Sequence, residues 1–212
     1  MKLFDVDGPL MAALNKLADL VFANLLFILF SLPVVTLGAS LTALQTVVLA
    51  LAEDEENLVV RKRFWQAFRR DFKQSTLLWG IFAAAALILM GSNAAAQSMG
   101  GSLGRFYAVF LGALGILLAM AFLIAFPLQS RYPAPAVQTV KTAFLLMVLR
   151  LPLAAGMLAV SILAVYLSFF LNPDLFGGAL FLWLAVGFAL VAYLNAFLAL
   201  RAFRVLPDGG EN

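Results

Sequence analysis

Long apolar runs are the feature of this sequence that most limits what it can fold into. Apolar stretches of about 18 residues or more recur along the chain, and one such stretch can cross the hydrocarbon core of a bilayer as a helix. Hydrophobic residues make up 64% of the chain and charged residues 12%, with a mean hydropathy of +1.02. A soluble domain is only about 45–50% apolar and about 25% charged. The sequence therefore predicts an all-α polytopic membrane protein.

The apolar runs predict six membrane-spanning helices. The longest charged interval, from Glu53 to Lys73, is too short to form a domain of its own, so we expect a single integral membrane domain over residues 1–212. We expect the first run to remain in the mature protein, because a second apolar run follows it closely. A second interfacial helix is possible over residues 136–149. The expected spans are residues 9–32, 36–52, 75–97, 105–128, 151–171 and 175–200.

A helix break is expected between the first two spans, over Ser31–Ser40. Pro33 lacks an amide hydrogen and disfavours a helical conformation at the residue before it, so the first helix should end there. Thr36 can cap the second helix by accepting its free amides, and Gly38 is small enough for another backbone to approach closely. The second span is short, so the two helices could instead form a re-entrant hairpin buried in protein.

Broken membrane helices leave backbone groups free to bind a substrate or an ion. The residues of a candidate polar site at this break are Asp19, Asn24, Ser31, Thr36 and Ser40. An ionisable group inside a span indicates function by default, so Asp19 could couple proton or cation movement. The alternative is a local pair with Lys16 that reaches the membrane interface. A tight turn between two spans would explain the break equally well.

The charged interval divides into an acidic and a basic part. The acidic run from Glu53 to Glu56 is interpreted as a solvated helix stop. Residues 58–74 predict a basic amphipathic helix that lies in the membrane interface, because phenylalanines recur there every four residues. This helix could bind anionic lipid or dock on a partner, whereas its position between two spans argues against nucleic acid. The candidate lipid or partner surface comprises Arg61, Phe64, Trp65, Phe68, Arg69, Phe72 and Lys73.

The distribution of basic residues predicts the orientation. With six spans, thirteen of the 14 Lys and Arg residues fall on the side of the two termini, and Arg105 alone falls on the other side. Basic residues concentrate on the cytoplasmic side of membrane proteins. We therefore expect a multi-pass protein of the cell membrane with both termini in the cytoplasm.

The sequence offers little for catalysis. It contains no Cys and no His, which removes thiol chemistry, the commonest metal ligand and the usual general base near neutral pH. The acidic run lacks the glycine turn and spacing of a calcium loop. No phosphate-binding GxxxxGK[ST] loop is present, so the chain could not power transport with ATP alone. We expect no enzymatic activity, no cofactor site and no metal site.

Five segments of the first part of the chain carry a resemblance to a known family: Asn15–Leu20, Asn24–Leu26, Ser31–Thr36, Leu41–Leu44 and Phe68–Gln74. Over about residues 3–80 the chain resembles the YesL-like family of bacterial integral membrane proteins. Members of that family are usually encoded beside ATP-driven carbohydrate uptake systems and glycan-degrading enzymes, which implies an accessory role in saccharide import with permease subunits as partners. The resemblance carries over no catalytic residues, and the acidic run departs from the family pattern.

Three functions are therefore expected as alternatives. The first is a non-enzymatic accessory subunit of carbohydrate uptake. The second is a self-sufficient secondary transporter or channel that uses the polar site at the break. The third is a structural membrane scaffold without a substrate.

Overall fold

A computed structural model of the chain describes residues 9–55, 57–170 and 176–206, and these residues form helices and no strands. Six of the helical segments are long and apolar enough to cross a membrane, so the predicted all-α, multi-pass architecture is confirmed. The elements are α1 (Pro9–Ser31), the 3-10 helix η1 (Val34–Thr36), α2 (Leu37–Ala52), α3 (Val60–Met99), α4 (Gly101–Arg131), α5 (Ala136–Leu149), α6 (Leu151–Phe169), α7 (Phe176–Leu182), the π-helix η3 (Trp183–Gly187) and α8 (Phe188–Phe203).

The predicted break between the first two helices is present. Helix α1 ends at Ser31, Pro33 is extended with a ψ of 116°, and α2 begins at Leu37 after the single turn of η1. The predicted capping role of Thr36 is wrong, because its side chain accepts no amide of α2. Its hydroxyl instead donates to the carbonyl oxygens of Phe30 at 2.7 Å and Pro33 at 2.8 Å. Thr36 thus holds the end of α1 against the turn.

The basic segment and the third span form one continuous helix, where the sequence predicted an interfacial helix over 58–74 and a separate span from residue 75. Helix α3 has 40 residues and is about 60 Å long at the usual rise of 1.5 Å per residue. It stays continuous because its buried positions keep a helical period through the expected boundary, and no Pro interrupts them. Those positions are Val60, Phe64, Ala67, Phe68, Asp71, Ser75, Leu78 and Phe82.

The last apolar run is one continuous helical segment that changes type in its middle. The π-helix η3 separates α7 from α8, where the sequence predicted a regular helix over 175–200. A π-turn closes its hydrogen bonds over five residues rather than four, so it displaces carbonyls and amides from the regular pattern. These backbone groups need partners from elsewhere in the bundle.

Helix α2 is the most buried of the candidate spans, with 61% of its apolar window inside the protein. It packs against α1, α3, α4 and α8. Small residues allow this close packing, and Gly38 is the tightest point. A Cβ atom added at Gly38 would lie 2.2 Å from the carbonyl oxygen of Ser75 and 2.6 Å from Cβ of Trp79. The close backbone approach expected at Gly38 is therefore confirmed, and the approaching helix is α3.

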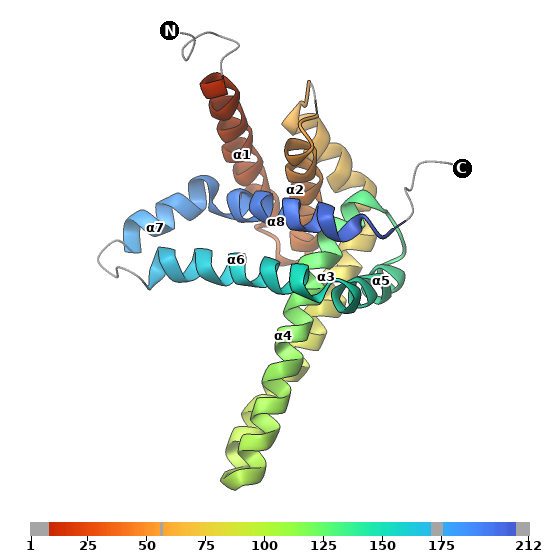
Figure 1. Cartoon of the computed structure of the whole chain (residues 1–212), viewed down its shortest axis with the longest axis vertical. Helices are drawn as coiled ribbons and strands as arrows, with labels where there is room; N and C mark the ends of the chain where they lie inside the picture. Colours follow the sequence, from red (N-terminus) through yellow and green to blue (C-terminus); the bar gives the residue numbers. More distant parts are fainter. Residues whose placement is uncertain (1–8, 56, 171–175, 207–212) are drawn as a thin grey trace.

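Helices α1 and α2, helices α3 and α4, and helix α6 with the α7–α8 segment run antiparallel to each other, and these pairs point in different directions (Figure 1). Helices α1 and α2 lie beside the N-terminal part of α3, and the α3–α4 pair continues well beyond them. Helix α6 and the α7–α8 segment run across the α3–α4 pair. The α3–α4 extension exposes many apolar side chains, as expected of a surface in contact with lipid. Among them are Leu87, Ile88, Met90, Phe106 and Val109, each 68–74% exposed.

Candidate functional site

The hydroxyl groups of the helix break are occupied by nearby backbone. Ser31 Oγ donates to the Phe27 carbonyl at 2.5 Å, and Ser40 Oγ donates to the Thr36 carbonyl at 3.0 Å. Together with the two hydrogen bonds of Thr36, these contacts pair the hydroxyl donors with backbone carbonyls of residues 27–36. Hydroxyls used in this way stabilise local backbone. Each of the three hydroxyl protons already has a protein acceptor.

Asn24 is fully buried and bonds the π-helix of the last segment. Its Nδ2 donates to the carbonyl oxygens of Trp183 at 3.1 Å and Leu184 at 2.8 Å, and its Oδ1 accepts the amide of Ala189 at 3.0 Å. One side chain of α1 therefore supplies both donors and an acceptor to backbone groups that the π-turn displaces. The structure separates Asn24 from the hydroxyls of the break and assigns it to this helix contact.

Asp19 lies away from the break. Twelve residues separate it from Ser31 on α1, which is about 18 Å of helix, so the structure does not bring Asp19 together with Ser31, Thr36 and Ser40. Asp19 is half-buried and lines a cleft of about 460 Å³ with Asn15 and Asp54. The expected pair between Lys16 and Asp19 is replaced, because Lys16 Nζ binds the carboxylate of Asp54.

The acidic run connects three helices at one end of the bundle. Glu53 binds Arg131 of α4 at 2.7 Å, Glu55 binds Arg63 of α3 at 2.9 Å, and Asp54 binds Lys16 of α1. Helix α2 does end before this run, as predicted, but the carboxylates of Glu53, Asp54 and Glu55 are paired rather than simply solvated. Each exposed pair contributes only about 0–1 kcal/mol. Their combined effect is to fix the α2–α3 turn against its neighbours.

A charged cleft of about 300 Å³ lies between α2, α3 and α4 at the same end. Arg63 and Arg131 on its walls are paired with Glu55 and Glu53, and Arg70 contacts the carboxylate of Asp71. Because each of these arginines has a carboxylate partner, the cleft offers a fixed polar surface rather than free cations for an anion. Its lining includes Thr46, Glu53, Glu55, Arg63, Gln66, Arg70 and Arg131.

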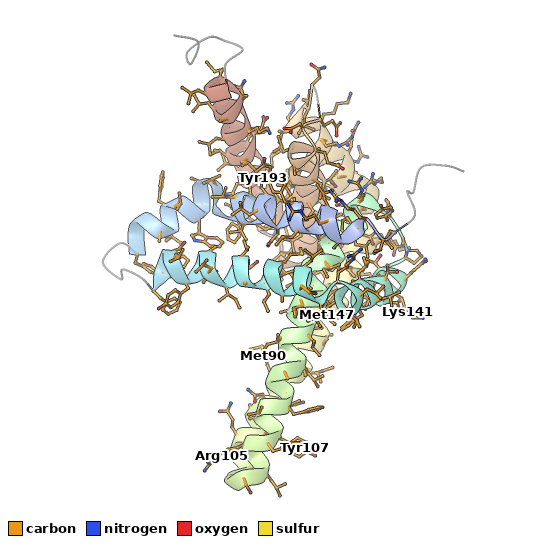
Figure 2. The ribbon with its side chains drawn as sticks, viewed as in Figure 1. Met90, Arg105, Tyr107, Lys141, Met147 and Tyr193 are labelled. Carbon is orange, nitrogen blue, oxygen red and sulfur yellow. The ribbon has the colours of Figure 1, made fainter. Side chains whose placement is uncertain are left out.

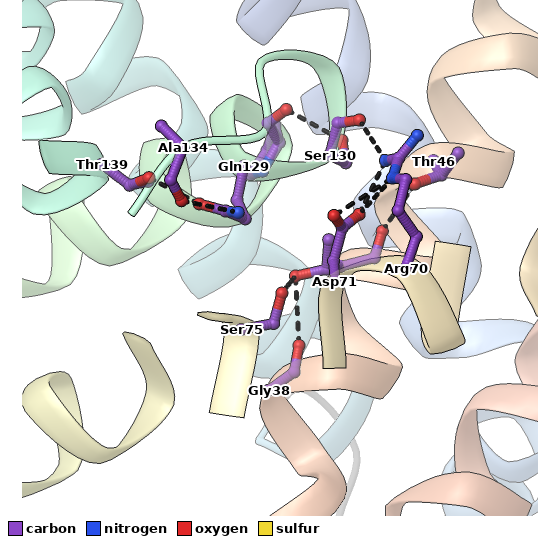
Figure 3. A network of polar contacts seen from close by, with 11 residues as sticks. Gly38, Thr46, Arg70, Asp71, Ser75, Gln129, Ser130, Ala134 and Thr139 are labelled. Atoms are coloured by element: carbon purple, nitrogen blue, oxygen red, sulfur yellow. Dashed lines mark hydrogen bonds and ion pairs between the residues drawn. The ribbon is translucent and has the colours of Figure 1, made fainter. Parts of the chain in front are cut away.

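Polar side chains also hold the turn between α4 and α5 (Figure 3). The carboxylate of Asp71, which is 3% exposed, accepts a hydrogen bond from Arg70 Nη2 at 2.6 Å. The same Nη2 atom donates to the Ser130 carbonyl at 3.1 Å, so Arg70 connects α3 to the end of α4.

A second group of contacts lies within the turn itself. Gln129 donates to the Ala134 carbonyl at 3.1 Å and accepts the hydroxyl of Thr139 at 2.5 Å. Thr42 of α2 donates to Ser75 of α3 at 2.8 Å in the same region. Sequence reasoning missed this network, although polar residues inside apolar runs mark most of its members.

The predicted lipid or partner surface is divided between core and exterior. Phe64 and Phe68 are 1% and 8% exposed, and their rings pack on Phe30 of α1 with centroids 5.8 Å and 5.1 Å away. These two rings belong to the core because α1 and α2 cover that face of α3. Phe72 is exposed beside them, at 39%.

The exposed remainder forms a basic stripe, which we define as Arg61, Trp65, Arg69 and Lys73. Their spacing of four residues places them on one face of α3, and all four are exposed. The guanidinium of Arg69 lies 5.8 Å from the ring centre of Trp65, within the range of a cation–π contact. Within the described residues none of the three cations has an ion-pair partner. The stripe therefore differs from the paired arginines of the charged cleft.

Sequence reasoning also missed two carboxamides inside the bundle. The Oε1 atom of Gln45 and the Oδ1 atom of Asn195 are buried without a hydrogen-bond partner, and both residues line a cavity of about 180 Å³. An unpaired buried acceptor costs about 1–3 kcal/mol. Isolated carboxamides inside apolar runs were the available signal. Among the described residues, no group of three carboxylates is placed to hold a metal ion.

Comparison with known proteins relates only the first part of the chain to a family. Residues 20–92, about a third of the sequence, match a family described as protein of unknown function, DUF624. No curated protein and no solved structure matches the chain. The matched region contains the helix break, Gly38, the acidic run and the basic stripe. From Leu20 to Ser92, the chain is therefore similar to DUF624 proteins.

Proposed function

We propose that this chain is a non-enzymatic accessory subunit of an ATP-driven carbohydrate importer in a bacterial cell membrane. The resemblance to YesL-like proteins supports the proposal, and DUF624 is the family of those membrane proteins. The composition, without Cys, His or a phosphate-binding loop, favours a role that depends on partner subunits for energy and chemistry.

The basic stripe is the observation that carries the proposal. Other cations at this end of the bundle, such as Arg63 and Arg131, are paired with carboxylates, whereas the stripe is exposed along more than three turns of one rigid helix. The opposite face of the same helix is buried, so the stripe cannot turn inward without exposing Phe64. An exposed row of cations with an aromatic side chain suits an acidic surface of a permease subunit.

The proposal places this end of the bundle in the cytoplasm. Basic residues gather there, and Arg105 lies at the far tip of the α3–α4 pair (Figure 2). A 40-residue helix exceeds the roughly 30 Å hydrocarbon core of a bilayer by about twofold. The basic third of α3 would then extend into the interface and the cytoplasm.

The test is capture of the tagged protein from its native host in mild detergent, with identification of the proteins recovered. Wild-type protein is expected to recover permease subunits in stoichiometric amount. The variant Arg61→Glu/Arg69→Glu/Lys73→Glu should insert normally but lose them, because charge reversal repels an acidic surface. The matched control, Lys141→Glu/Arg201→Glu/Arg204→Glu, makes the same charge change at exposed positions elsewhere and should retain them. Recovery of the chain alone, or equal recovery with both variants, would reject the proposal.

A self-sufficient transporter is the second candidate, and the half-buried Asp19 in its open cleft is the observation that favours it. The hydrogen bonds of the break do not favour it, because the hydroxyls of Ser31, Thr36 and Ser40 already donate to backbone carbonyls. Purified protein in liposomes decides between the two. Solute flux that Asp19→Asn abolishes would support the transporter, and absence of both flux and partners would leave a structural scaffold.

A further inference from the structure

The cavity that contains the two unpaired carboxamide oxygens lies where five helices and the π-helix meet. Its volume is about 180 Å³, and an apolar cavity of about 150 Å³ holds one benzene molecule. A single six-membered ring therefore fits. The walls are largely apolar and include five aromatic side chains: Phe27 of α1, Phe122 and Phe126 of α4, Trp183 of η3 and Phe188 of α8.

The polar atoms of the cavity require a hydrogen-bond donor. Ser161 Oγ donates to the Met157 carbonyl at 2.9 Å and accepts Asn195 Nδ2 at 3.0 Å. The bond to Ser161 fixes the orientation of the Asn195 carboxamide. Its Oδ1 atom has no hydrogen-bond donor, and the residue is only 3% exposed. Gln45 Oε1 on α2 is a second acceptor without a donor. Lipid chains could not satisfy either atom, because they carry no hydrogen-bonding groups.

The aromatic wall at Trp183 is held in place by specific contacts. A Cβ atom at Gly187 would lie 2.9 Å from Cγ and Cδ2 of Trp183, so the glycine provides space for the indole. Asn24 accepts the Ala189 amide and binds the Trp183 carbonyl from the other side. The Trp183 ring meets Phe188 edge-on, with centroids 5.0 Å apart. The π-turn thus presents an indole to the cavity in a fixed position.

We propose that this cavity binds one small neutral molecule that presents hydroxyl groups on a frame of about one six-membered ring. Neutrality follows because no lining residue is charged, and burying an ion without a counter-charge is costly. Hydroxyls are the groups that two carboxamide acceptors require, and the aromatic walls suit the apolar faces of the ring. The proposal stands independently of any carbohydrate importer.

The probe is cyclohexane-1,4-diol, added to purified protein in detergent, with 1,4-dimethoxycyclohexane as the matched control that lacks hydrogen-bond donors. Intrinsic fluorescence and thermal unfolding report binding. The fluorescence response should be saturable for the diol, weak for the ether and lost in Trp183→Phe, which removes one of the three tryptophans. Asn195→Leu and Gln45→Leu should each weaken diol binding by roughly twofold to tenfold. Gln97→Leu, at an exposed site on α3, should leave it unchanged.

Three results would overturn the proposal. The first is the absence of a saturable response to the diol in wild-type protein, which is expected if the cavity holds water alone. The second is equal binding of the diol and the ether, and the third is equal diol affinity in Gln45→Leu and wild type. Gln45 is only partly buried, so Gln45→Leu and the ether comparison decide the question if Asn195→Leu does not fold.

Discussion

Gly38 shows how one residue determines the distance between two helices. The carbonyl oxygen of Ser75 and the Cβ atom of Trp79 occupy the space that any side chain at position 38 would need. The hydroxyl of Thr42, one turn further along α2, then reaches Ser75 Oγ at 2.8 Å. The sequence indicated that a small residue here allows a close approach, but it could not identify α3 as the partner, since the two contact sites are 37 residues apart.

Substitution Gly38→Ala tests this contact. The added Cβ would meet Ser75 backbone at 2.2 Å, so α2 and α3 must separate, and we expect a loss of about 1–3 kcal/mol of stability and a fall in Tm of roughly 2–10 °C. Thermal unfolding in detergent measures it. Gly112→Ala is the matched control, because its added Cβ would meet nothing beyond its own stretch of helix within 4 Å and alanine favours a helix. Equal Tm values for the two variants would contradict the close contact.

At the scale of elements, the sequence predicted the helix end that a local residue causes. It did not predict helix boundaries that depend on packing against other helices. Pro33 ends α1 through its own backbone, so the break could be predicted locally. The helix boundary expected near residue 75 rested on the change from a basic to an apolar composition. The buried face of α3 continues through this point, so the helix does not end there. The π-turn of η3 was not predictable from nearby residues, because its partner Asn24 lies 159 residues from Trp183.

The π-turn should depend on Asn24. The variant Asn24→Leu leaves the Trp183 and Leu184 carbonyls and the Ala189 amide without their partner, and we expect a loss of at least about 3 kcal/mol. Hydrogen exchange should rise first in residues 183–189, where the freed amide lies. Asn15→Leu on the exposed face of the same helix should change stability by no more than about 0.5 kcal/mol. Unchanged exchange in residues 183–189 would show that the π-turn is held by other contacts.

At the scale of the whole molecule, charge is gathered at one end and apolar surface at the other. The ion pairs of Glu53, Asp54 and Glu55 join α4, α1 and α3 at the charged end. The four-residue spacing of the phenylalanines predicted an amphipathic helix, and the predicted surface placed the four residues of the basic stripe together with Phe64, Phe68 and Phe72. Spacing could not show that Phe64 and Phe68 face the core, since that depends on where Phe30 of α1 lies. The distribution of charge nevertheless predicts how the protein is oriented in the membrane, and this orientation can be tested.

The predicted orientation places the tip of the α3–α4 pair outside the cell and α5 inside. Because the chain contains no Cys, single cysteines can be introduced at exposed sites without background: Ser102→Cys beside the tip and Lys141→Cys on α5. A membrane-impermeant maleimide should label Ser102→Cys in intact cells, and it should label Lys141→Cys only after the membrane is permeabilised, because basic residues remain on the cytoplasmic side. The reverse pattern would place the basic stripe outside the cell, and a cytoplasmic partner could then not bind it.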